Sequence, residues 1–202
     1  MERKLSTIFA SDVVGISKMM EKNEEATLRH LKKRRLVIDG LISEFGGNIF
    51  GTAGDSVIAE FPSPIKATEC AVKIQYKMQA INLDLKDSDK MIYRIGINIG
   101  DVMIAENNLF GDAVNIAVRL EAAAKPSGIC ISKPVFDMIG QKLKISFEDA
   151  GSLELKNIEN AEPGSIAVLL FKNLSSDEEQ QYFCEGFSED LISALSRFKK
   201  LA

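Results

Sequence analysis

The stretches FASDVVGIS (residues 9–17) and GGNIFGTAGDSVIAEF (residues 46–61) decide the fold of this chain. An apolar run at residues 5–10 predicts a buried strand that delivers Asp12 at its end. In the second stretch, two apolar runs flank glycines, which predicts a hairpin carrying Asp55 at its turn. Carboxylates on neighbouring strands commonly hold divalent ions for phosphoryl or nucleotidyl transfer. Spacing alone also allows a second interpretation, two acidic turn residues in solvent.

Strand and helix patterns alternate outward from these stretches. Apolar runs bounded by turn residues predict strands at 5–10, 48–50, 56–61, 93–99, 102–105, 128–132, 145–149 and 153–155. Apolar stripes predict helices after Asn23, after Pro64, at 112–124 and after Ser132. The mixture of hairpins and βαβ units indicates an α+β fold, a mainly antiparallel sheet with helices packed on it.

The chain changes character at residue 164. An apolar run, SIAVLLF, is followed there by a polar linker and by the helix-like segment SEDLISALSRFKKLA, which ends the chain. We therefore expect one domain over residues 1–163 and a C-terminal extension over residues 164–202. The extension is interpreted as the start of a following domain.

Composition limits the classes of partner and of chemistry. The chain has 202 residues and a net charge of −4, so nucleic acid and anionic membrane are not expected as partners. It carries no apolar run of membrane-spanning length and no signal-peptide pattern. Three cysteines without metal spacing fit reduced thiols in a cytoplasmic protein. Because His30 is the only histidine, catalysis has to rest on carboxylates, amides and cations.

Three further features suggest phosphate chemistry. Asn115 and Arg119 lie four residues apart on a predicted helix and so project from one face. An amide beside a guanidinium suits a ribose oxygen and the charge that develops on a phosphorane, although such pairs are frequent on helix surfaces. Successive backbone amides at residues 13–17 lead into a helix and form a candidate triphosphate cradle. Lys156, after a strand-like run, either pairs with a terminal phosphate or faces water.

Five motifs, in order, resemble the class III adenylyl/guanylyl cyclase catalytic domain in its bacterial form. They are FASDVVGIS (9–17), GGNIFGTAGDSVIAEF (46–61), RIGINIGDV (94–102), NLFGDAVNIAVRLE (108–121) and LKNI (155–158). The resemblance covers about residues 5–158 and implies a ferredoxin-like domain that forms a head-to-tail homodimer. The tail from SIAVLLF onward resembles the segment that follows this domain in many bacterial relatives, ahead of helical repeats.

The resemblance implies a metal site and a phosphate cradle on one subunit. Asp12 and Asp55 match the carboxylates that hold two Mg²⁺ or Mn²⁺ ions per site, with the Val13 carbonyl as an added ligand. The cradle for the triphosphate is matched by a short run of backbone amides, those of Val14, Gly15, Ile16 and Ser17.

The resemblance assigns the remaining catalytic groups to the other subunit. Asn115 matches the amide that orients the ribose, and Arg119 matches the guanidinium that meets the charge at the α-phosphate. Lys156 matches the lysine that holds the terminal phosphates. Because each site draws on two subunits, a homodimer would hold two equivalent sites and a monomer would hold none.

Two positions depart from the adenylyl pattern of the family. Gly51 stands where that pattern has an adenine-selecting lysine, and Asn108 stands where it has the partner aspartate. Neither residue matches the guanylyl pattern. The resemblance implies that the chain forms a 3′,5′-cyclic nucleotide and pyrophosphate from a nucleoside triphosphate, with ATP as the expected substrate. The alternatives are a catalytically silent module for dimerisation or nucleotide sensing and, third, a guanylyl cyclase.

Overall fold

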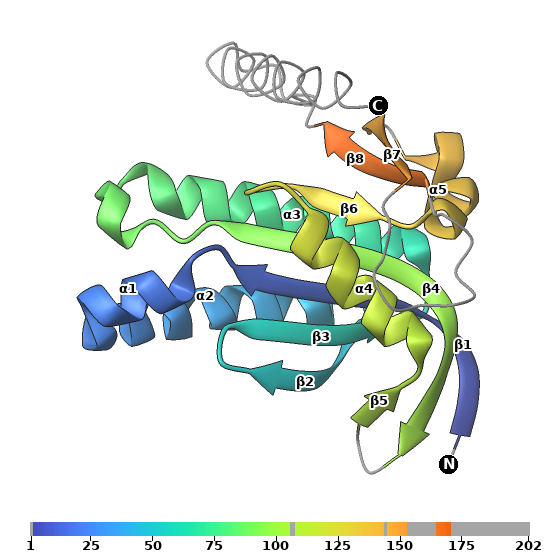
Figure 1. The fold of residues 1–202 in the computed structure, drawn as a ribbon, viewed down its shortest axis with the longest axis horizontal. Helices are drawn as coiled ribbons and strands as arrows, with labels where there is room; N and C mark the ends of the chain where they lie inside the picture. The colour runs from blue at the N-terminus through green and yellow to red at the C-terminus, as the bar shows by residue number, and fades with distance from the viewer. Residues whose placement is uncertain (1, 106–107, 144, 153–164, 171–202) are drawn as a thin grey trace.

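The computed structural model of the chain describes residues 2–105, 108–143, 145–152 and 165–170 (Figure 1). In chain order its elements are β1 (Glu2–Val13), α1 (Ile16–Lys22), α2 (Glu24–Glu44), β2 (Asn48–Ala53), β3 (Ser56–Phe61), α3 (Pro64–Leu83), the 3-10 turn η1 (Asp87–Asp89), β4 (Tyr93–Ala105), β5 (Asn108–Phe110), α4 (Asp112–Ala123), β6 (Ile129–Ile131), α5 (Lys133–Ile139), the 3-10 turn η2 (Gly140–Lys142), β7 (Ser146–Ser152) and β8 (Ser165–Leu170).

The strands form one sheet in the order β2-β3-β1-β4-β6-β8-β7, with β5 paired to β4. All described pairs are antiparallel except that of β4 with β6. The succession β1-α2-β2-β3-α3-β4 with strand order β2-β3-β1-β4 is the ferredoxin-like arrangement. Helices α2 and α3 cover one face of the sheet and α4 crosses the other (Figure 1). The predicted α+β fold is confirmed.

Strand β1 lies at the centre of the sheet and is buried on both faces. Phe9 belongs to the larger core under α2 and α3, whereas Ile8 and Ala10 belong to a smaller core under α4. A strand covered on both sides has a continuous rather than an alternating apolar sequence. Its far end, which carries Asp12, is therefore held on a rigid element.

Helix α4 lies in direct contact with β4 because β4 has glycine where the two elements cross. A Cβ atom on Gly96 would stand 2.2 Å from both the Ala117 carbonyl oxygen and the Glu121 amide nitrogen. Such a distance is far below van der Waals contact, so only glycine permits this approach. The buried side of α4 correspondingly carries small side chains, since Ala113 and Ala117 pack against the sheet.

The boundaries of several strands differ from those predicted, most clearly in β1, β2 and β4. The prediction of two strands at 93–99 and 102–105 is wrong, because Gly100 and Asp101 pair with β1 and a single strand β4 runs through. Strand β1 likewise continues past Asp12, which pairs with β4 instead of following the strand. Strand β2 extends to Ala53 and leaves only Gly54 and Asp55 in the turn, where Gly54 adopts a φ of 62°.

The extension predicted from residue 164 begins within the sheet. Residues of β8 pair with β6 on one side and with β7 on the other. The division of the chain at 163/164 remains a prediction, and the strand predicted at 153–155 lies outside the described residues. In the described part of the chain, no helix combines the length and apolar character needed to cross a membrane.

Candidate active site

Asp12 on β1 forms a bidentate ion pair with Arg94 on β4. The two residues stand directly opposite in the strand register. Arg94 Nε donates to Asp12 Oδ1 at 3.2 Å and Nη2 donates to Oδ2 at 2.8 Å. This pairing raises the pKa of Arg94, and it engages both carboxylate oxygens of Asp12.

Asp55 is fixed next to Asp12 by a backbone hydrogen bond. The Val13 amide donates to Asp55 Oδ2 at 2.8 Å, and this hydrogen bond links the turn between β2 and β3 to the end of β1. The structure therefore brings the two carboxylates predicted for metal binding to one place. Asp12 and Asp55 also act together on nearby charges, because both raise the pKa values of Arg94 and Glu121.

Glu121, on α4, completes this charged cluster. Its carboxyl group is buried, and burial, followed by a hydrogen bond to Asp12 and the charges of both aspartates, raises the pKa of Glu121 to about 8. Two carboxyl groups can share a hydrogen bond only if one is protonated, so this contact is consistent with the raised pKa of Glu121. Glu121 Oε1 also lies 3.1 Å from Arg94 Nη2, a charge contact without hydrogen-bond geometry.

The analysis of the sequence did not single out Arg94 or Glu121. Arg94 is the first residue of the motif RIGINIGDV, and Glu121 is the last residue of the motif NLFGDAVNIAVRLE. Their charges within these motifs were the signal that could have identified them. Arg94 Nη1 also donates to the Ala122 carbonyl at 2.9 Å. Arg94 thus joins the aspartate end of β1 to the C-terminal end of α4.

Asn115 and Arg119 lie on α4 away from the aspartates. Asn115 is exposed and Arg119 is half-buried, four residues along the same helix. In the described part of the chain, neither forms a hydrogen bond or ion pair with Asp12 or Asp55. Arg119 Nη1 is buried and has no hydrogen-bond partner there. A buried donor without a partner is costly and indicates a group that a ligand would satisfy.

The predicted phosphate cradle is smaller than expected. The Val14 amide donates to the Ile92 carbonyl at 2.8 Å and is therefore already used. Gly15, with a φ of 70°, caps α1, and the amides of Gly15, Ile16 and Ser17 have no backbone acceptor among the described residues. These three donors remain for a phosphate. Lys156 lies outside the described residues.

The two positions predicted to read the base lie on elements that contact each other. Gly51 is in β2 opposite Ile58, and Asn108 is in β5, which touches β2. Leu109, next to Asn108, packs on the small core that includes Ile58. A Cβ atom on Gly51 would stand 3.7 Å from Ile58 Cβ, an ordinary contact, and Gly51 does not have a positive φ. A side chain can therefore be accommodated at residue 51.

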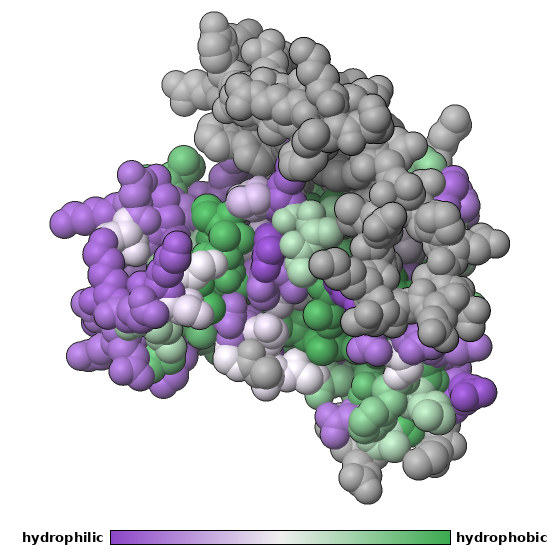
Figure 2. Space-filling model, viewed as in Figure 1, coloured by the Kyte–Doolittle hydropathy of each residue, from purple (hydrophilic) through white to green (hydrophobic). Residues whose placement is uncertain are grey.

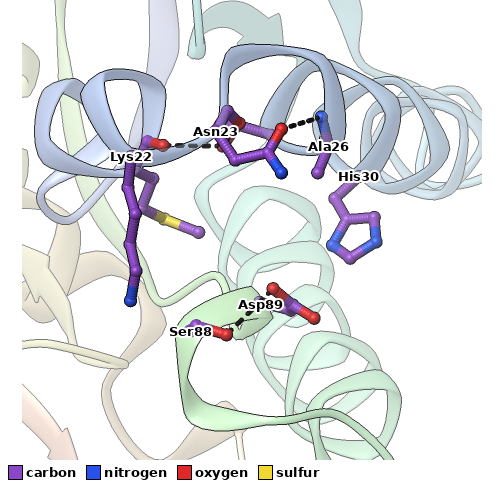
Figure 3. Close-up of a pocket in the computed structure, with 8 residues that line it drawn as sticks. Lys22, Asn23, Ala26, His30, Ser88 and Asp89 are labelled. Atoms are coloured by element: carbon purple, nitrogen blue, oxygen red, sulfur yellow. Dashed lines mark hydrogen bonds between the residues drawn. The ribbon is translucent and has the colours of Figure 1, made fainter.

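A cavity of about 180 Å³ lies elsewhere, where α1, α2 and η1 meet (Figure 3). His30 and Asp89 face it, and the Asn23 side chain accepts from the Ala26 amide at its edge (Figure 3). None of its lining residues is a predicted site residue. A site completed by a second chain need not form a pocket in one chain, so this cavity does not locate the active site.

The donor set at Asp12 and Asp55 fits a magnesium-type ion. Mg²⁺ and Mn²⁺ prefer oxygen ligands, and two carboxylates with a main-chain carbonyl supply only oxygen. Each carboxylate oxygen keeps a lone pair beyond its present hydrogen bond. In the described part of the chain, no group of three or more His, Cys, Asp or Glu side chains could hold a metal, so other ligands of an ion here would come from water or substrate.

The ferredoxin-like fold occurs in many classes of protein, so comparison with known families is needed to specify the class of this domain. The family model described as "Adenylate and Guanylate cyclase catalytic domain" matches residues 2–184. The chain belongs to this family, which confirms the resemblance inferred from the five motifs.

Individual relatives agree. "Putative adenylate cyclase 3" of Rhizobium meliloti (strain 1021) is 38% identical over 227 aligned residues, covering 98% of this chain and 39% of that protein. The chain therefore spans about two fifths of that relative. The "Adenylate/Guanylate Cyclase/Hydrolase" structure from Silicibacter pomeroyi is 39% identical, with a TM-score of 0.78 over 85% of this chain and 99% of that one. The adenylyl cyclase CyaB of P. aeruginosa shares the fold, at 23% identity and a TM-score of 0.73 over 88% and 100% of the two chains.

We predict that Glu121 makes the stability of the metal-free protein depend on pH. Its pKa is higher in the folded chain than the ordinary 4.5, so the folded state holds an extra proton between pH 4.5 and about 8. The contribution of Glu121 to stability is therefore full below that range and is lost as pH rises through it. Glu121→Gln cannot ionise and should remove most of this loss.

Urea unfolding between pH 5 and pH 9, with a chelator present, measures the effect. The variant Glu21→Gln, at an exposed position on α1, is the control and should follow the wild type. Equal pH dependence in the wild type and in Glu121→Gln would show that Glu121 does not titrate in this range.

Proposed function

We propose that the chain is a nucleotide cyclase that converts ATP to 3′,5′-cyclic AMP and pyrophosphate at the interface of a homodimer. The observation that carries the proposal is the hydrogen bond from the Val13 amide to Asp55, which fixes one carboxylate beside the other. Like charges held together normally destabilise a fold, and divalent ions bound by both carboxylates would offset that cost. Family membership supplies the reaction class.

In this proposal Asp12 and Asp55, with the Val13 carbonyl, hold two Mg²⁺ or Mn²⁺ ions. Bound there, the ions would neutralise the triphosphate and lower the pKa of the ribose 3′-hydroxyl. The amides of residues 15–17 would donate to phosphate oxygens. The 3′-oxygen forms a bond to the α-phosphorus, the bond from that phosphorus to the bridging oxygen breaks, and the hydroxyl proton and pyrophosphate are released.

The partner chain would supply the groups that meet the reacting atoms. The Asn115 amide would orient the ribose ring, and Arg119 would donate to the α-phosphate as its charge develops. The buried Arg119 Nη1, which has no hydrogen-bond partner in the described part of the chain, supports this assignment. Lys156 would hold the terminal phosphates. A preorganised donor needs little rearrangement in the transition state, which is the basis of its catalytic effect.

The surface around α4 and β5 supports the proposed homodimer. Figure 2 shows hydrophobic side chains gathered over β5, at the lower right of this face. Phe110 on β5 is 49% exposed and Val118 on α4 is 39% exposed, close in sequence to Asn108 and Asn115. Exposed apolar side chains beside catalytic groups suit a surface that a second chain covers.

The metal assignment predicts that Asp12→Asn and Asp55→Asn each lower turnover at least about a hundredfold, because an amide does not replace the charge that holds a divalent ion. Cyclic nucleotide formation from ATP with Mn²⁺ is the measurement, and thermal melting checks that each variant is folded. Asp137→Asn, at an exposed position on α5, should retain wild-type turnover.

Turnover of either Asp12→Asn or Asp55→Asn near the wild-type rate would remove this metal site. If the wild type binds nucleotide but forms no cyclic product from any triphosphate, the silent sensing or dimerisation module replaces the cyclase. The altered residues at positions 51 and 108 are the observation that favours this second candidate.

The shared site predicts that two inactive variants complement each other. Asp55→Asn and Arg119→Ala each damage every site of their own homodimer. In the mixed dimer one site collects both changes and the other is intact, so random pairing restores about a quarter of wild-type activity. Mixing the two variants after demonstrated subunit exchange is the test, and the absence of any recovery would place each complete site within one chain.

The altered base-reading positions predict weak discrimination between ATP and GTP. Gly51 has no side chain to donate to the base, and the Asn108 amide can present either a donor or an acceptor. Buried polar groups that match one base discriminate strongly, so their loss should cost selectivity more than chemistry. Gly51→Lys with Asn108→Asp should raise the ATP-to-GTP ratio of kcat/KM at least about tenfold.

Steady-state rates with both triphosphates measure this ratio. Asn108→Asp alone is the matched single change, because it keeps the shape of the side chain and restores a fixed acceptor. A strong preference for ATP in the wild type would show that other groups read the base.

A further inference from the structure

Asp12 is paired with a cation before any metal is bound. Arg94 engages both of its carboxylate oxygens, at 3.2 and 2.8 Å. Two parallel N–H bonds to one carboxylate are the strongest form of side-chain ion pair. An incoming divalent ion and this guanidinium compete for the same negative charge.

Arg94 is held in this position from more than one side. It stands opposite Asp12 in the strand register, and its Nη1 donates to the Ala122 carbonyl at 2.9 Å. Its side chain is 24% exposed, and Nη2 lies 3.1 Å from Glu121 Oε1. A solvated surface ion pair contributes little because its side chains move freely, but this one is fixed by three elements.

The charge of Arg94 acts on the whole cluster. A guanidinium remains charged at every pH at which proteins are folded. The groups that face it are Asp12, Asp55 and Glu121, all of which raise its pKa. In the described part of the chain it is the one cation that contacts Asp12 and Glu121.

We infer that Arg94 is the resident counter-cation of the metal site, and that a divalent ion has to displace it from Asp12 in order to bind. The inference rests on the proposed function, which assigns Asp12 to metal binding. Arg94 is thus a positioning residue that lowers the metal affinity of the nucleotide-free chain. Displaced from Asp12, it keeps its contacts with Ala122 and Glu121 on α4, so the displacement needs no unfolding.

The test is Mn²⁺ binding to the full chain without nucleotide, measured from the electron paramagnetic resonance of free Mn²⁺ at fixed pH and ionic strength. Arg94→Met keeps the length of the side chain and removes its charge, so it should bind Mn²⁺ at least about tenfold more tightly than the wild type. Arg94→Lys keeps the charge and should stay within about threefold of the wild type. Arg35→Met, on α2 beside Asp39, is the control and should change nothing.

Equal or weaker Mn²⁺ binding by folded Arg94→Met would overturn the inference. If that variant does not fold, the wild type still decides, because saturating Mg²⁺ should shift the Nε–H resonance of Arg94 in ¹⁵N NMR, and an unchanged resonance would overturn the inference. Asp55→Asn separates the two hypotheses. If it binds Mn²⁺ as the wild type does, the proposed metal site itself fails, whereas weaker binding by Asp55→Asn without tighter binding by Arg94→Met rejects only the role of Arg94.

Discussion

The antiparallel pairing of β1 with β4 determines where most residues of the charged site lie. It runs from Glu2 opposite Ile104 to Val13 opposite Tyr93 and sets Asp12 against Arg94. The same register carries Gly96 to the place where α4 crosses, so the helix lies directly on the strand. A shift of this register by one residue would turn Asp12 to the other face of the sheet and remove the contact with Arg94. The position of α4 and the charge balance of the aspartates are thus consequences of one ladder of hydrogen bonds.

The local sequence predicts the elements of this fold better than it predicts their lengths. Asp12 and Asp55 could be found because each follows an apolar run at the edge of a recognisable strand or turn. The pair Gly100-Asp101 has the composition of a turn, but pairing with β1 keeps it extended. Tertiary pairing overrides local preference here, which is why one strand was predicted as two.

Arg94 and Glu121 show the limit of prediction for the site. Arg94 contacts Asp12, 82 positions away in the sequence, and it also links strand β4 to Glu121 on helix α4. These contacts depend on the register of the strands and on the close approach of α4 at Gly96. The sequence of one chain reveals neither the strand register nor the approach of the helix. The raised pKa of Glu121 needs burial as well as neighbours, and burial follows only from the packed structure. Residue types alone therefore predict the two aspartates but not Arg94 and Glu121, which surround them.

In the proposed function, chemistry and base selection would occupy separate parts of the molecule, so that one could change without the other. The charged cluster lies at the junction of β1, β4 and the end of α4, whereas Gly51 and Asn108 lie on β2 and β5. In the proposed function, electrostatic groups there would act on the triphosphate, which is common to every nucleotide, and the outer pair would contact only the base. The hydrogen bonds of Asp12, Asp55 and Arg94 involve neither residue 51 nor residue 108. Under this proposal, differences at residues 51 and 108 would bear on which nucleotide is used, and the charged cluster would bear on whether the phosphorus is attacked at all.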